Sequence, residues 1–84
     1  MTWTIFYHPE VEEDLESVGP SAARRIMRAI DSKLAKAPLQ FGSSLSGHLA
    51  NFRKLRIGDY RVIYTIIENT VLVLRISHRR DAYR

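Results

Sequence analysis

The fold of this chain is decided by the stretch Phe52-Arg53-Lys54-Leu55-Arg56-Ile57-Gly58-Asp59-Tyr60-Arg61-Val62-Ile63-Tyr64. On both sides of Gly58-Asp59, apolar side chains alternate with cationic ones, and a period of two is typical of a strand with two unlike faces. We expect a hairpin with a two-residue turn at Gly58-Asp59, in which Arg56 lies opposite Arg61. One face of the hairpin then carries Lys54, Arg56 and Arg61. The other face carries the apolar residues Leu55, Ile57, Tyr60, Val62, Tyr64 and Ile66.

A further strand is expected over Val71–Ser77, after a turn at Glu68-Asn69-Thr70. A three-residue loop places Arg75 with the cations, and the apolar face then holds Leu72, Leu74 and Ile76. A two-residue loop would put Arg75 among the core residues instead. Because an unpaired buried guanidinium is strongly unfavourable, we expect the first register.

The N-terminal half of the chain predicts one strand and two helices. The run from Trp3 to Tyr7 is β-branched and aromatic, which indicates a first strand. A short amphipathic helix follows Pro9, with its apolar residues at helical spacing: Val11, Leu15 and Val18. Gly19-Pro20 separates it from a longer helix that ends before Pro38. The apolar stripe of the longer helix is Ala23, Ile26, Ile30, Leu34 and Ala37.

The segment from Leu39 to Asn51 is rich in Gly and Ser and is expected to be a loop. The element order is therefore β-α-α-β-β-β, in a single domain over residues 1–84. This order predicts an α+β fold in which a helical hairpin packs on one face of a mostly antiparallel four-stranded sheet. The helices would cover the apolar face and leave the cationic one open.

Charge is distributed unevenly along the 84 residues, whose net charge is +4. Residues 52–84 hold eight basic and three acidic side chains, whereas residues 1–51 hold five basic and six acidic ones. Cations that are segregated onto strands and interleaved with tyrosines favour an anionic ligand, most simply nucleic acid. A solvated basic surface without a ligand is the alternative interpretation.

The sequence excludes several kinds of chemistry. There is no cysteine, so disulfides and thiolate chemistry are ruled out. The histidines at positions 8, 48 and 78 lack metal-ligand spacing, so neither a metal nor another cofactor is expected. No signal peptide and no apolar stretch of membrane-spanning length is visible, and we expect a cytoplasmic protein.

Cleavage of RNA does not require a metal. It requires a group that deprotonates the 2′-hydroxyl, cations that stabilise the phosphorane, and a proton donor for the leaving 5′-oxygen. The terminal run His78-Arg79-Arg80-Asp81-Ala82-Tyr83-Arg84 adds an imidazole, guanidinium groups and a ring that can stack on an unpaired base. The composition therefore permits metal-free RNA cleavage without establishing it, because a basic tail is often simply solvated.

The hairpin from Phe52 to Tyr64 and the terminal run together resemble the RelE branch of the RelE/ParE toxin superfamily. The pattern LR-x-GDYR-x-x-Y and the ending HRRD-x-Y are specific in combination, and the preceding β-α-α order matches as well. The resemblance implies a bacterial or archaeal toxin of a type II toxin–antitoxin system. Toxins of this branch cleave mRNA in the ribosomal A site and so inhibit translation, and a RelB-like antitoxin wrapped around them silences them.

The resemblance also implies catalytic roles. Lys54 matches a lysine that serves as base or phosphate stabiliser, and Arg61 matches the arginine that stabilises the transition-state phosphate. Arg79 matches a C-terminal arginine proposed to act as acid or charge stabiliser. Tyr83 matches the tyrosine that stacks on the substrate base.

Three further arginines are candidates for RNA binding: Arg56, Arg75 and Arg80. Arg56 matches a basic hairpin position that contacts phosphate, Arg80 could share the role of Arg79, and the register places Arg75 with the cations. Like charges directly opposite each other on a sheet repel, so Arg56 opposite Arg61 suggests that a carboxylate or a bound phosphate lies between them. Two solvated side chains that splay apart are the alternative.

One position departs from the family pattern. Well-known members have a second lysine two residues before the one that matches Lys54, and here Phe52 stands there. Arg53 is a poor substitute, because strand alternation points it to the other face. Two candidates for the general base follow, Lys54 and, since some relatives use a histidine, His78. We favour Lys54, and an ordinary hydrogen-bonding role at the strand end is the alternative for His78.

Two rival functions remain open. A ParE-like inhibitor shares the fold but acts by binding DNA gyrase, and such relatives tend to lack the basic catalytic set and the terminal tyrosine. The other rival is a catalytically weakened relative that only binds its antitoxin, which the presence of Phe52 favours. We expect an endoribonuclease whose substrate is mRNA on the ribosome.

Overall fold

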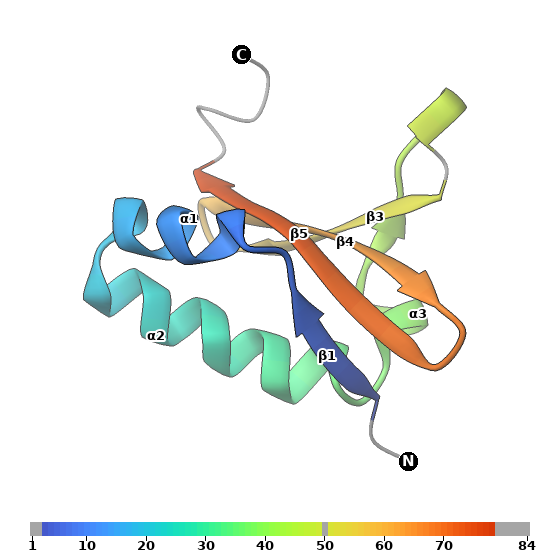
Figure 1. Ribbon diagram of the computed structural model, residues 1–84, viewed down its shortest axis with the longest axis horizontal. Helices are drawn as coiled ribbons and strands as arrows, with labels where there is room; N and C mark the ends of the chain where they lie inside the picture. The colour runs from blue at the N-terminus through green and yellow to red at the C-terminus, as the bar shows by residue number, and fades with distance from the viewer. Residues whose placement is uncertain (1–2, 50, 79–84) are drawn as a thin grey trace.

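The computed structural model describes residues 3–49 and 51–78 of the chain. Two helices lie against one side of a curved sheet of five strands (Figure 1). The predicted α+β class and the helical hairpin on one sheet face are therefore confirmed, whereas the expected number of strands is wrong.

The sheet is mixed rather than purely antiparallel. Its strands are β1 (Thr4–Tyr7), β2 (Ser43–Ser44), β3 (Phe52–Ile57), β4 (Tyr60–Ile67) and β5 (Thr70–His78). Their spatial order is β1-β5-β4-β3-β2, with β1 parallel to β5 and the other pairs antiparallel. The strand that the sequence does not predict is β2. It consists of two serines beside a glycine, and these residues have no hydrophobic period that would indicate a strand.

The β3–β4 hairpin has the predicted register. Gly58-Asp59 forms a two-residue turn with Gly58 at φ 58°, a conformation that glycine adopts without strain. Arg56 pairs with Arg61, and Leu55 pairs with Val62. Because Leu55 and Val62 are 4% and 0% exposed, the apolar face of the hairpin is the one that faces the helices.

The start of β5 differs from the prediction. The loop before it is a two-residue turn at Glu68-Asn69, where Glu68 takes a positive φ of 56°. The core residues in this part of the strand are therefore Val71 and Val73, both 0% exposed. The expected core positions Leu72 and Leu74 are wrong, since both side chains are only half-buried.

A β-bulge reconciles this short turn with the burial of Ile76. The pairing shifts between Ile63 and Tyr64 of β4, so that Leu74 is an extra residue on β5. The extra residue reverses the alternation, which brings Ile76 into the core at 2% exposure and turns Arg75 out of it. Both placements are as predicted, but a bulge produces them rather than a longer loop.

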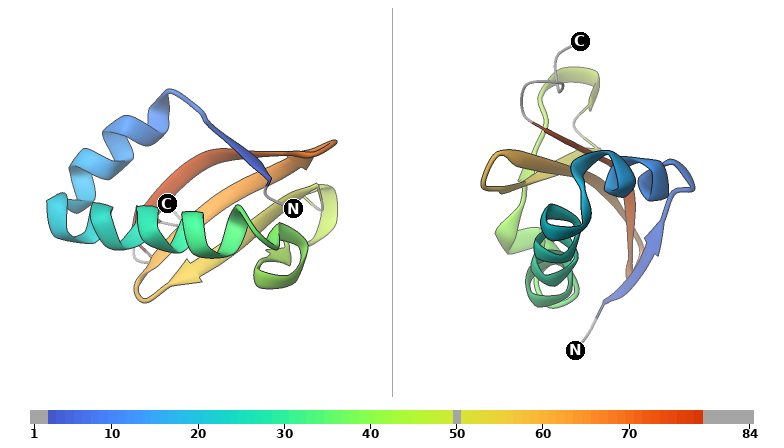
Figure 2. Two further views of the ribbon diagram at one scale, coloured as in Figure 1. Left: turned by 90° about the horizontal axis from the view of Figure 1, so that it is seen from below. Right: turned by 90° about the vertical axis from the view of Figure 1, so that its left-hand side faces the viewer.

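Both helices of the hairpin lie on the same side of the sheet (Figure 2). They are α1 (Glu10–Val18) and α2 (Pro20–Ala29), and α2 continues into a π-helical turn, η1 (Ile30–Leu34). Gly19 joins them at φ 90°, and Pro20 occupies the first position of α2, as the sequence predicts. No helix in the described ranges is long and apolar enough to span a membrane.

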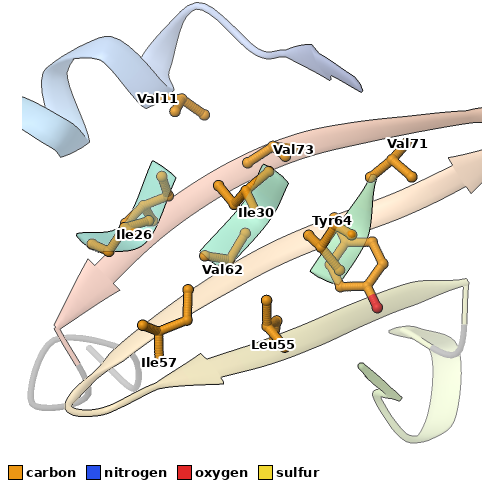
Figure 3. Packing of buried hydrophobic residues seen from close by; sticks show 11 residues of the cluster. Val11, Ile26, Ile30, Leu55, Ile57, Val62, Tyr64, Val71 and Val73 are labelled. Carbon is orange, nitrogen blue, oxygen red and sulfur yellow. The ribbon is translucent and has the colours of Figure 1, made fainter. Parts of the chain in front are cut away.

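The core lies between this helical layer and the sheet (Figure 3). Ile26 and Ile30 from the helical layer meet Val62, Tyr64 and Val73 from the sheet, and all five are 0% exposed. Burying one aliphatic side chain of this size contributes roughly 1.5–3 kcal/mol. These contacts fix the orientation of the strands and hence of the side chains on the opposite sheet face.

The segment expected to be a loop contains three short elements: α3 (Pro38–Phe41), β2 and the 3₁₀ turn η2 (Gly47–Leu49). Hydrogen bonds to the sheet hold this segment in a defined conformation. The expectation of an irregular loop from Leu39 to Asn51 is therefore wrong in part.

Arg53 and Tyr64 anchor this segment, and we call them the Arg53–Tyr64 clamp. The fully buried Tyr64 hydroxyl donates to the Pro38 carbonyl oxygen at 2.6 Å. Arg53 Nη2 donates to the carbonyl oxygens of Leu39 and Gly42 at 3.0 and 2.8 Å, and its Nε donates to Tyr64 Oη at 3.3 Å. The prediction that Arg53 points away from Lys54 is thus confirmed.

Candidate nucleic-acid interface

The sheet face turned away from α1 and α2 carries Lys54, Arg56 and Arg61, and we call it the cationic face. These residues alternate with the buried ones: Lys54 pairs with Ile63, and Arg56 pairs with Arg61. Arg56 is exposed, whereas Lys54 and Arg61 are half-buried. Neighbouring strands lie about 4.8 Å apart, so these side chains can reach a shared phosphate group.

The charge on the cationic face suits a polyanion. Within residues 3–49 and 51–78, no salt bridge joins Lys54 or Arg56 to an acid. Arg56 and Arg61 are directly opposed, and like charges in that arrangement destabilise a sheet. The sequence predicts that a carboxylate or a bound phosphate between the two guanidinium groups relieves this repulsion, and both stay predictions.

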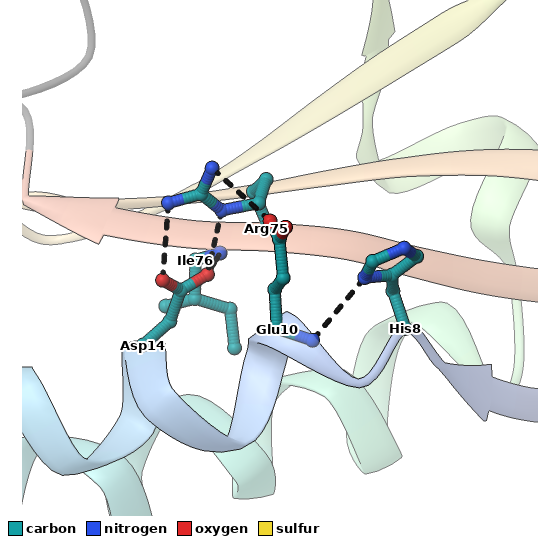
Figure 4. Close-up of polar contacts among 5 residues, drawn as sticks. All are labelled: His8, Glu10, Asp14, Arg75 and Ile76. Atoms are coloured by element: carbon teal, nitrogen blue, oxygen red, sulfur yellow. Dashed lines mark hydrogen bonds and ion pairs between the residues drawn. The ribbon is translucent and has the colours of Figure 1, made fainter.

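Arg75 pairs with Ile63, the partner of Lys54, so it starts on the cationic face, but its guanidinium is bound by acids of α1 (Figure 4). Its Nε and Nη2 donate to the two carboxylate oxygens of Asp14 at 3.0 and 3.2 Å, and its Nη1 lies 3.4 Å from Glu10 Oε2. The hydrogen bonds that Arg75 donates to Asp14, and the attraction of Asp14 and Glu10, raise the pKa of Arg75. A role for Arg75 in RNA binding stays a prediction.

Asp14 also covers the backbone of β5 at the point where β1 has ended. The β1–β5 pairing stops at Tyr7 and Val73, and further along Asp14 Oδ2 accepts a hydrogen bond from the Ile76 amide at 2.9 Å. The Asp14 side chain is only 11% exposed. The acids of α1 therefore satisfy the sheet edge and Arg75, and they do not neutralise the cationic face.

His78 does not join the cationic face. It pairs with Tyr60, and the two rings meet edge to face with their centroids 5.3 Å apart. Tyr60 packs against the core, so His78 lies on the helix side of the sheet, where it lines a hollow of about 310 Å³ that Asp14 also lines. This position argues against His78 as the partner of Lys54 in catalysis.

Three of the predicted site residues, Arg79, Arg80 and Tyr83, lie outside the described residues, and their roles stay predictions. Among the residues that are described, no group of three or more His, Asp or Glu side chains is arranged to hold a metal ion. Within the described residues, the candidate site therefore consists of Lys54, Arg56 and Arg61.

Phe52 lies on the cationic face, two positions before Lys54 on β3. It pairs with Thr65 and is half-buried. The place of the second family lysine is thus taken by an aromatic ring on the correct face. Arg53 cannot replace that lysine, because the clamp holds its guanidinium on the other side of the sheet.

Sequence reasoning missed a hollow beside the cationic face, at the outer edge of β3. The hollow has a volume of about 440 Å³ and is lined by Lys33, Phe41, Ser43, Lys54, Leu55 and Arg56. Lys33 was expected only as helix surface, and Phe41 only as part of a loop. A large aromatic residue three positions after a helix-ending proline is the signal that could have found it.

The chain thus has a helical hairpin on one face of a mixed sheet, with cations gathered on the other face. Residues 5–83 match the family model described as "ParE toxin of type II toxin-antitoxin system, parDE". The chain belongs to the RelE/ParE superfamily of type II toxin–antitoxin toxins.

Relatives named as Rel toxins cover nearly the whole chain. The chain is 31% identical over 86 residues to Toxin RelG of Mycobacterium tuberculosis, which covers 100% of this chain and 99% of that protein. It superposes with a TM-score of 0.88 on a chain of the toxin–antitoxin complex RelBE2 from the same organism, at 29% identity over 96% of this chain and 95% of that one. The archaeal RelE–RelB complex from Pyrococcus horikoshii OT3 gives a TM-score of 0.71 at 25% identity, over 98% and 100% of the two chains.

Proposed function

We propose that this toxin is an endoribonuclease that cleaves mRNA in the ribosomal A site and so inhibits translation. The observation that carries the proposal is the clustering of Lys54, Arg56 and Arg61 on one sheet face, away from both helices. Such a cluster can hold a phosphate and stabilise the charge that develops in its transition state. Similarity to Toxin RelG, rather than to the gyrase-directed branch alone, supports the choice.

In the proposed reaction, the 2′-oxygen of one nucleotide attacks its neighbouring phosphorus, and the 5′-oxygen of the next nucleotide leaves. Lys54 takes the proton of the 2′-hydroxyl, while Arg61 and Arg56 stabilise the phosphorane. Arg79, for which the family resemblance implies a role as acid or charge stabiliser, protonates the leaving oxygen or stabilises its charge while water supplies the proton, and Tyr83 stacks on the substrate base. The products are a 2′,3′-cyclic phosphate and a 5′-hydroxyl.

Lys54 is the better candidate for the general base. It shares the cationic face with Arg61, whereas His78 packs against Tyr60 on the helix side of the sheet. Arg80 would extend the phosphate contacts beyond β5. Arg75 would contribute only if RNA competed successfully with Asp14 for its guanidinium.

A RelB-like antitoxin is the proposed partner that silences this activity in the cytoplasm. The solved relatives RelBE2 and RelE–RelB are toxin–antitoxin complexes. An acidic antitoxin segment would be complementary to the cationic face and would remain partly disordered until bound. An antitoxin bound there would exclude RNA by direct competition.

The proposal is tested by adding the purified toxin to a translation system programmed with one defined mRNA. We expect cleavage at the codon in the A site, with 2′,3′-cyclic phosphate ends. Arg61→Ala should reduce the single-turnover rate about 10²–10³-fold, the usual effect of removing one transition-state charge donor. Arg24→Ala, at an exposed arginine of α2 away from the cationic face, is the matched control and should cleave normally. An intact mRNA with the unmodified toxin would overturn the proposal.

Gyrase inhibition is the second candidate, and the ParE description of the matching family model is what favours it. A supercoiling assay with purified gyrase separates the two functions. Under our proposal, gyrase activity is unaffected at toxin concentrations that cleave mRNA. Inhibited supercoiling together with intact mRNA would assign the chain to gyrase.

A further inference from the structure

The hollow beside the cationic face has the chemistry of a nucleotide subsite. Of its six lining residues, three are cations and none is an acid: Lys33, Lys54 and Arg56 surround an aromatic ring, Phe41. We propose that this hollow takes one base of a single-stranded RNA, stacked on Phe41, next to the nucleotide whose phosphate lies on the cationic face. The inference rests on the proposed function, because it assigns a further nucleotide of the same RNA.

Phe41 is exposed although the backbone around it is held in place. Its exposure is 51%, yet Arg53 donates to the carbonyl oxygen of the next residue, Gly42, at 2.8 Å. At the other end of α3, the Tyr64 hydroxyl donates to Pro38 at 2.6 Å. A large ring on a fixed backbone loses little conformational entropy when a ligand covers it. These are the properties of a stacking platform, and the fold itself leaves half of the ring uncovered.

Lys33 adds a cation beside the ring. Its ammonium nitrogen lies 5.9 Å from the ring centroid of Phe41, within the range of a cation–π contact. This contact orients both side chains toward the hollow. A base on Phe41 would therefore bring its phosphate close to Lys33.

The hollow is continuous with the cationic face, because Lys54 and Arg56 line both. Ser43 pairs with Lys54, so the Ser43 hydroxyl stands on the same face beside the ammonium group. Arg53 and Lys54 are the residues of β3 that pair with β2, and from Leu55 onward no strand in the described part of the chain pairs with the outer edge of β3. An RNA strand with one phosphate on the cationic face can therefore extend directly across this edge to Phe41.

An acidic peptide would also complement the three cations of the hollow. RNA fits better, because a nucleotide supplies both a flat ring for Phe41 and an anion for the cations, whereas a carboxylate side chain supplies only the anion. The proximity of Lys54, the proposed base, places the subsite beside the cleaved bond.

The experiment follows binding of a single-stranded hexaribonucleotide at low salt by NMR, in an Arg61→Ala background that slows cleavage. We expect the ring protons of Phe41 to shift upfield as the oligonucleotide is added. Phe41→Ala should weaken binding about tenfold, which corresponds to about 1.4 kcal/mol. Phe41→Trp should restore binding. The matched control is Leu39→Ala, since Leu39 lies on the same helix at 61% exposure and does not line the hollow.

Abasic oligonucleotides identify the stacked base. The affinity for intact RNA should differ tenfold between the Arg61→Ala protein and the same protein with Phe41→Ala. This difference should vanish when the missing base is the one that stacks on Phe41, because the oligonucleotide then has no base to stack on the ring. At other positions the difference should persist. A difference that persists at every position would contradict base stacking.

The inference is overturned if Phe41→Ala and Leu39→Ala bind RNA equally, or if no ring proton moves at millimolar oligonucleotide. It is also overturned if Phe41→Ala weakens binding of an acidic peptide but not of RNA, which would assign the hollow to a protein partner. Cleavage of mRNA without any effect at Phe41 removes this inference alone. A stacked base without mRNA cleavage removes the proposed function alone.

Discussion

Removal of one hydroxyl group from the Arg53–Tyr64 clamp tests how the sheet holds the Phe41 subsite. In Tyr64→Phe the ring stays in the core, but the Pro38 carbonyl oxygen loses a 2.6 Å hydrogen bond at a buried position. Arg53 Nε loses an acceptor as well, although its other donors keep theirs. A buried acceptor without a partner costs about 1–3 kcal/mol, and we therefore expect a loss of about 2 kcal/mol.

Urea unfolding followed by circular dichroism measures this loss, and a domain of this size should melt about 8–16 °C lower. The urea m-value should not change, because the same surface is exposed on unfolding. The control is Tyr7→Phe, at a tyrosine on β1 that is 37% exposed, which should change the stability by less than about 0.5 kcal/mol. If Tyr64→Phe is as stable as the control, the clamp does not anchor α3 and the case for a preorganised Phe41 fails.

Three further predictions concern single side chains. Arg56→Gln removes one cation from the cationic face and should slow mRNA cleavage; unchanged cleavage would remove Arg56 from the site. Asp14→Ala leaves the Ile76 amide without its acceptor and should cost about 1–3 kcal/mol in urea unfolding, together with faster amide exchange at Ile76; slow exchange would contradict this role. Phe52→Lys restores a second amine on the cationic face and should speed cleavage, and an unchanged rate would show that Lys54 suffices.

The parts of the fold that the sequence predicts are those where independent rules agree. In the β3–β4 hairpin, the period of two and the turn preference of Gly58 lead to one register, which the structure has. Three of the five predicted stripe residues of the long helix, Ile26, Ile30 and Leu34, are likewise 0% exposed. Ala23 is only half-buried, and Ala37 lies beyond the helical turns, which end at Leu34 rather than at Pro38. Each of these patterns is local, so no knowledge of distant contacts is needed.

The register of β5 shows why the remainder could not be predicted. Residues 71–74 are all apolar, so either alternation buries two of them and hydrophobicity does not choose between the registers. Only Arg75 and Ile76 discriminate, and they pointed to the correct faces. The bulge at Leu74 places Arg75 and Ile76 on these faces although the turn before β5 has only two residues. No residue type near Leu74 would have predicted a bulge there.

The site shows the same division. Lys54, Arg56 and Arg61 were found because they sit on strands of strong period. The partners of Arg53 are carbonyl groups of a segment 11 and 14 residues earlier, and backbone acceptors leave no trace in the sequence. The hollow around Phe41 was not predicted for a related reason. The hydrogen bonds of the Arg53–Tyr64 clamp fix α3, and the sequence gives no sign of them.

The position of β5 has a consequence for how the toxin is made. β5 is the last strand to be synthesised, yet it lies inside the sheet, between β1 and β4. It supplies Val71, Val73 and Ile76 to the core, so a nascent chain that lacks it has neither a partner for its first strand nor a closed interior. Folding must therefore wait until β5 has been synthesised, because contacts this distant in sequence cannot form earlier. The strand that completes the middle of the sheet thus also sets the earliest moment at which a folded toxin can exist.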